Sequence, residues 1–157
     1  MNKLLSKLQI EQYENDGYVV PDFKMPEDTL KKIEERHDEL LKKHPEFKNY
    51  CPAILHYDES FLEFCKNEII LNYVEQILGS NFALWNSSFF AKPAINGHAT
   101  PWHQDGQYWP IRPLATCTVW LAIVAVAAAP FISLLVGTTM ITSAAAVAAA
   151  VAAAAAV

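Results

Sequence analysis

No charged residue follows Arg112 in this sequence, and no histidine follows His103. The three cysteines form neither a CxxC motif nor an even set, which disfavours a metal cluster or a disulfide framework and favours free thiols in a reducing compartment. A net charge of −5, without a concentrated basic stretch, argues against a nucleic-acid partner. The N-terminal stretch lacks the unbroken apolar core of a signal peptide, so we expect a cytoplasmic protein.

The charge that is present divides the chain into two unlike parts. Every charged residue lies within positions 1–112, whereas residues 144–157 consist only of alanine and valine. A chain of 157 residues is long enough for one domain with a modest core. The two parts do not have the composition of a single globular domain.

Helical periodicity and helix-ending residues predict three helices in the first part of the chain. A short apolar strand at residues 18–20 separates the first helix from the second. Pro26 suits the first position of the second helix, and Asn67 suits the N-cap of the third. The expected helices span residues 9–16, 26–44 and 67–79.

Period-two alternation from Asn81 onwards predicts strands. One face of the first strand is expected to carry Phe82, Leu84, Asn86, Ser88 and Phe90. A later strand begins near Ala115, and one of its faces is expected to carry Thr116, Thr118 and Trp120. Helices followed by strands indicate an α+β fold whose β part belongs to a barrel or jelly roll.

His103 and Asp105 lie two residues apart in the extended stretch WHQD, so their side chains share one face of a strand. Together they supply two of the three ligands of a 2-His-1-carboxylate iron site. Taken alone, the pair also fits a solvated strand end. His98 has the opposite strand parity and is interpreted as a loop histidine, and His37 is expected to pack against the rim of the core.

The flanks of this pair make the pattern more specific. The sequence reads DGYVV at 16–20, FFAKP at 89–93, PWHQD at 101–105 and VW at 119–120. With these motifs, residues 9 to about 122 resemble the phytanoyl-CoA dioxygenase family of Fe(II)- and 2-oxoglutarate-dependent oxygenases. The resemblance implies N-terminal helices followed by part of a double-stranded β-helix (a jelly-roll, cupin-like core) that is incomplete at the C-terminus.

The resemblance also implies roles for particular residues. His103 and Asp105 match the first two iron ligands of the family. Trp120 stands where the family has a tryptophan lining the 2-oxoglutarate pocket. Gln104 matches a residue near the cosubstrate, and Ser88 matches a position that contacts 2-oxoglutarate.

The chemistry implied is hydroxylation of a small or lipid-like substrate by O2, with 2-oxoglutarate converted to succinate and ascorbate as an optional reductant. The metal supplies the redox chemistry, and the protein supplies geometry and excludes water. Related iron halogenases replace the ligating carboxylate by a small residue. Asp105 therefore favours hydroxylation over halogenation.

The second half of the family pattern is missing from this sequence. The family continues with a distal iron histidine and an arginine that pairs with 2-oxoglutarate, and neither follows Ala122 here. We therefore assign residues 1–122 to a truncated dioxygenase-like domain and residues 123–157 to an uncharged Ala/Val-rich tail. The alternative is a catalytically inactive fragment or a membrane-tethered interaction protein that keeps the N-terminal half of the family.

The tail permits three interpretations. Residues 119–141 carry no charge and are long enough to cross a bilayer of roughly 30 Å, with Arg112 on the cytoplasmic side, although Pro130 weakens such a span. The tail is otherwise a frame-shifted gene end, or a segment written as alanine because its side chains were not identified. We favour an artefactual or degenerate end over a membrane anchor.

Overall fold

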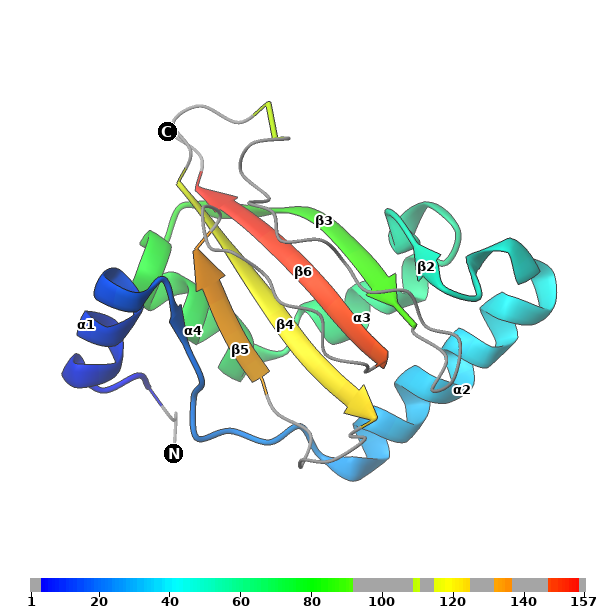
Figure 1. The fold of residues 1–157 in the computed structure, drawn as a ribbon, viewed down its shortest axis with the longest axis horizontal. Helices are drawn as coiled ribbons and strands as arrows, with labels where there is room; N and C mark the ends of the chain where they lie inside the picture. Colours follow the sequence, from blue (N-terminus) through cyan, green and yellow to red (C-terminus); the bar gives the residue numbers. More distant parts are fainter. Residues whose placement is uncertain (1–3, 92–108, 111–114, 125–131, 137–146, 156–157) are drawn as a thin grey trace.

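The computed structural model describes residues 4–91, 109–110, 115–124, 132–136 and 147–155. Helices dominate the first part of the chain, and strands dominate the second (Figure 1). The helices are α1 (Lys7–Asp16), α2 (Glu27–Lys43), α3 (Leu62–Cys65) and α4 (Glu68–Leu78), with short 3-10 turns at Pro45–Phe47, Ile54–His56 and Glu59–Phe61. The strands are β1 (Tyr18–Val19), β2 (Tyr50–Cys51), β3 (Phe82–Phe90), β4 (Thr116–Val124), β5 (Ile132–Val136) and β6 (Val147–Ala155).

The six strands form one antiparallel sheet in the order β1-β5-β4-β6-β3-β2. Helices α3 and α4 lie behind this sheet in Figure 1. The α+β class with helices preceding an antiparallel sheet is thus confirmed. Both β5 and β6 come from residues 123–157, and β6 lies between β3 and β4.

The helix ends follow local capping chemistry. Helix α1 begins two residues earlier than predicted because the Ser6 and Gln9 side chains form a reciprocal capping box. It ends at Gly17, whose φ of 79° is the left-handed conformation that glycine adopts without strain. Pro26 is the N-cap of α2 rather than its first helical residue. Asn67 caps α4 by accepting hydrogen bonds from the backbone amides of its first turn, as expected.

The predicted face of β3 is wrong because a β-bulge interrupts the strand. The register against β6 shifts between Leu84 and Asn86. A bulge adds one residue to one strand and reverses the alternation beyond it. Phe82 and Phe89 therefore both pack on the helix side although their numbers differ by seven. Ser88 consequently lies on the face opposite that of Phe82.

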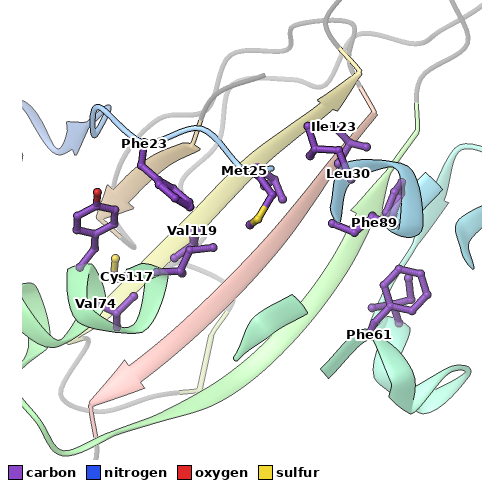
Figure 2. Packing of buried hydrophobic residues seen from close by; sticks show 14 of the residues in the cluster. Phe23, Met25, Leu30, Phe61, Val74, Phe89, Cys117, Val119 and Ile123 are labelled. Atoms are coloured by element: carbon purple, nitrogen blue, oxygen red, sulfur yellow. The ribbon is translucent and has the colours of Figure 1, made fainter. Parts of the chain in front are cut away.

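The hydrophobic core fills the space between the helices and the sheet. Alternate residues of β4 point into it, and Figure 2 shows Cys117 and Val119 among side chains from α4 and the segment before α2. The largest fully buried side chains include Tyr73 of α4 and Phe89 of β3. Because side chains alternate along a strand, the predicted set on β4 (Thr116, Thr118 and Trp120) occupies the other face.

Residues 119–141, considered above as a membrane span, include part of β4 and all of β5, which pair antiparallel. In the described parts of the chain, no helix has both the length and the apolar character needed to cross a bilayer.

His37 joins α2 to the sheet. Its ring stacks on Phe89 with centroids 3.9 Å apart, and only 6% of the residue is exposed. Within the described parts of the chain, Nε2 has no hydrogen-bond partner. The packing expected for this residue is therefore observed. Burial lowers the pKa of His37 below its ordinary value, against a weaker opposing effect of the Asp38 carboxylate.

We expect acidification to destabilise the protein through His37. Its pKa is lower in the folded chain than in the unfolded chain, where it is about 6.5. The unfolded chain therefore binds more protons below that pH, and folded-state stability falls as the pH decreases. Thermal melts between pH 7.5 and pH 5.0 check this prediction. The decrease in melting temperature on acidification should be smaller in His37→Phe, which keeps the ring stack. It should be unchanged in His56→Gln, which replaces an exposed histidine. Equal pH slopes in the wild type and His37→Phe would contradict it.

Candidate functional site

The face of the sheet opposite the helices carries a set of aligned polar residues. Ser88 on β3 and Trp120 on β4 both pair with Ala150 of the intervening β6. Asn86 and Thr118 are aligned in the same way, in the neighbouring row. Directly opposed residues of an antiparallel sheet point to the same face. The structure thus brings the two predicted cosubstrate residues that it describes, Ser88 and Trp120, onto one face and into one row.

The two residues differ in their surroundings. Ser88 is 7% exposed, and its Oγ lies 3.4 Å from the Asn86 side-chain amide, which donates to it. Trp120 is only partly buried. A hydroxyl held by a neighbouring amide remains able to donate its own proton to a ligand.

Two further polar residues on this face escaped the sequence-based selection of site residues. Thr116 and Thr118 are each 4% exposed, and the Oγ1 atom of each is buried without a hydrogen-bond partner among the residues that the structure describes. The available signal was the alternation Thr116, Thr118, Trp120, which predicted a shared face correctly. It did not reveal that the hydroxyls are buried and unpartnered.

The donor chemistry of this face fits a carboxylate-bearing cosubstrate such as 2-oxoglutarate. No strand of the sheet contains a charged residue, so the strands can offer only neutral donors. Serine and threonine hydroxyls each donate one hydrogen bond, and carboxylate oxygens are strong acceptors. The buried, unpartnered threonine hydroxyls are therefore suited to such a ligand.

The predicted iron ligands cannot be located in the same way. His103, Gln104 and Asp105 lie outside the described residues, as does His98. Within the parts of the chain that the structure describes, no cluster of three His, Cys, Asp or Glu side chains could hold a metal ion. The assignment of the iron to His103 and Asp105 stays a prediction.

The cysteines lie away from solvent and are not paired. Cys51, Cys65 and Cys117 are all free and buried, as expected for a chain without a disulfide framework. Burial raises the pKa of Cys117 to about 12 and that of Cys51 to about 11. Thiols of such high pKa are poor nucleophiles at neutral pH. Burial raises the pKa of the Cys65 thiol as well.

Solved structures share this arrangement of helices and sheet. The crystal structure of EctD from S. alaskensis with bound Fe matches with a TM-score of 0.81 at 12% identity, over 96% of this chain and 77% of that one. The carbocyclase SnoK from nogalamycin biosynthesis, described as non-heme and alpha-ketoglutarate dependent, matches with a TM-score of 0.75 at 15% identity, over 95% and 83%. At such low identity these matches establish a common fold.

Sequence comparison identifies the family. A probable phytanoyl-CoA dioxygenase of Caenorhabditis elegans is 28% identical over 76% of this chain and 48% of its own length. The chain thus spans about half the length of that curated relative. The sequence model of the family named Phytanoyl-CoA dioxygenase (PhyH) matches residues 13–129, which is most of the chain. The protein belongs to the phytanoyl-CoA dioxygenase family.

Proposed function

We propose that this protein is an Fe(II)- and 2-oxoglutarate-dependent dioxygenase that hydroxylates a small or lipid-like molecule. The observation that carries the proposal is the polar face of the sheet, where Ser88, Thr118 and Trp120 lie together on the side away from the helices. The family membership supports the same chemistry. In this proposal the sheet is one wall of a jelly roll.

Each residue has a defined part in this proposal. His103 and Asp105 hold the iron, and Gln104 lies beside the cosubstrate. The bound iron and 2-oxoglutarate supply the oxidising chemistry with O2. Ser88 donates a hydrogen bond to the cosubstrate, and the ring of Trp120 covers one side of it and keeps water out. Asp105, as a carboxylate ligand, favours hydroxylation.

A non-catalytic interaction protein is the second candidate. It is considered because the ligand set assigned above consists of His103 and Asp105 alone, whereas a 2-His-1-carboxylate site has three protein ligands. Two protein ligands leave a metal weakly held, because affinity depends on the complete ligand set and the groups that orient it. The two candidates differ in whether the protein turns over 2-oxoglutarate.

Succinate formation separates the two candidates. The purified chain is incubated with Fe(II), 2-oxoglutarate, ascorbate and O2, and succinate is measured with and without a metal chelator. A dioxygenase releases succinate slowly even without its organic substrate, and only when iron is present. Absence of succinate from protein shown to be folded by circular dichroism would reject the enzymatic function and favour the non-catalytic one.

We also propose a cytoplasmic location. Three free, buried thiols are compatible with a reducing compartment and give no disulfide that would require an oxidising one.

A further inference from the structure

A small cavity lies between the helices and the sheet, on the side away from Ser88 and Trp120. Its volume is about 30 Å³. Side chains from α3, α4, β3, β4 and the turn at Glu59–Phe61 contribute to its lining, which includes Phe61, Cys65, Ile70, Ser87, Val119 and Leu121. All six of these residues are buried, so the cavity is part of the helix-facing core.

The cavity offers little to a water molecule. Among the described residues, Cys65 and Ser87 are the only polar side chains of its lining. They contact each other, because the Cys65 thiol donates to the Ser87 Oγ at 3.8 Å. A buried water is stable where about two to four polar groups bind it, and a thiol is a weak partner. The cavity therefore suits an apolar occupant better than water.

The volume limits the size of that occupant. A single water molecule needs about 10–15 Å³ of such space, so about 30 Å³ has room for a molecule of two or three heavy atoms. A cavity that binds benzene is about five times larger, at about 150 Å³. A lipid-like or aromatic molecule is too large for this cavity.

We propose that this cavity is a binding site for a small apolar molecule of the size of dioxygen. Val119 and Leu121 line it and flank Trp120, whose side chain belongs to the other face of β4. Dioxygen is a co-reactant in the proposed function. The cavity needs no metal, however, and its occupancy is measurable without turnover. The inference thus goes beyond the proposed function and stands even if that function fails.

Xenon and dioxygen are suitable probes of this site. Methyl NMR spectra of the full chain are recorded without metal, under increasing xenon pressure and then with dioxygen in place of nitrogen. Xenon should shift the signals of Ile70, Val119 and Leu121 saturably, with a dissociation constant of about 10 mM or weaker, because so small a ligand makes few contacts. Paramagnetic dioxygen should broaden the same signals more than those of Leu40, a buried core residue.

A substitution that fills the cavity tests the location. Cys65→Leu places a larger apolar side chain in the lining and should abolish the saturable xenon shift. Its melting temperature should equal or exceed that of the wild type, since existing space is filled. Cys51→Leu makes the same change at a fully buried cysteine that does not line the cavity. It should keep the xenon response and lower the melting temperature through overpacking.

A second variant changes the cavity in the opposite direction. Ile70→Val removes one methyl group from the lining and enlarges the space, at a small cost in stability. Xenon should bind more tightly to this variant than to the wild type, because the larger space accommodates the atom with less strain.

Two results for the wild type would overturn the proposal. One is a folded protein without a saturable xenon shift at these methyl groups, and the other is dioxygen broadening no greater there than at Leu40. A xenon response that folded Cys65→Leu retains would also overturn it. If Cys65→Leu does not fold, Ile70→Val decides: tighter xenon binding supports the site, and unchanged or weaker binding overturns it.

Discussion

Replacing His103 with alanine is expected to reduce iron-dependent succinate formation by more than about 100-fold. The substitution removes one of only two protein ligands assigned to the metal. Loss of groups that merely orient such ligands already costs about 10- to 100-fold in affinity or activity. The rate of succinate formation and the stoichiometry of bound Fe(II) should fall together, because both depend on the same nitrogen ligand.

His98→Ala is the matched control for this prediction. It removes a histidine five positions earlier in the chain, to which we assign no ligand role. Succinate formation in His98→Ala should stay within about twofold of the wild-type rate, in contrast to the large loss expected for His103→Ala. Retained activity in His103→Ala together with loss in His98→Ala would show that the iron is held by a different histidine.

Replacing Phe89 with alanine is expected to lower the free energy of unfolding by about 3–5 kcal/mol, as is usual for a buried phenylalanine. The residue is 1% exposed, its ring stacks on His37, and the Phe61 ring packs edge-on at a centroid distance of 6.2 Å. Its loss opens a cavity where α2, the 3-10 turn at Glu59–Phe61 and β3 meet. Urea unfolding followed by circular dichroism measures the effect.

Phe90→Ala provides the comparison on the other face of the same strand. Phe90 is only partly buried, and its ring lies 4.8 Å from that of Tyr50, which is 44% exposed. Its substitution should cost clearly less than that of Phe89. Equal losses from the two variants would contradict the assignment of Phe89 to the core and Phe90 to the other face.

Features decided by neighbouring residues were predictable from the sequence. Asn67 and Gly79 delimit α4 because capping depends on side chains and dihedral angles within one turn. The two faces of β4 followed from simple alternation, which places Cys117 in the core and Thr118 opposite it.

Features decided by distant segments were not predictable. The bulge between Leu84 and Asn86 depends on the partner strand and reversed the predicted face of Ser88 relative to Phe82. Residues 147–155 contain only alanine and valine, so no polar alternation indicates a face or a partner. Pairing between strands far apart in sequence leaves little local signal.

The candidate site was likewise predictable from the sequence only in part. Ser88 and Trp120 were identified by resemblance to the family, and the register of β6 places them in one row. Thr116 and Thr118 were not identified as site residues, because threonine is common in strands. Their distinguishing property is burial without a hydrogen-bond partner among the described residues, which only the three-dimensional structure shows.

The position of β6 between β3 and β4 determines when the sheet can form during folding. Its two neighbours, β3 and β4, each pair with it along most of their length, so they have no common partner until residues 147–155 are present. During synthesis these two strands therefore leave the ribosome with unpaired edges, the state most prone to association with other chains. The pairing of β6 with β3 and β4 joins segments that are far apart in sequence. We therefore expect this pairing to be the slow step of folding.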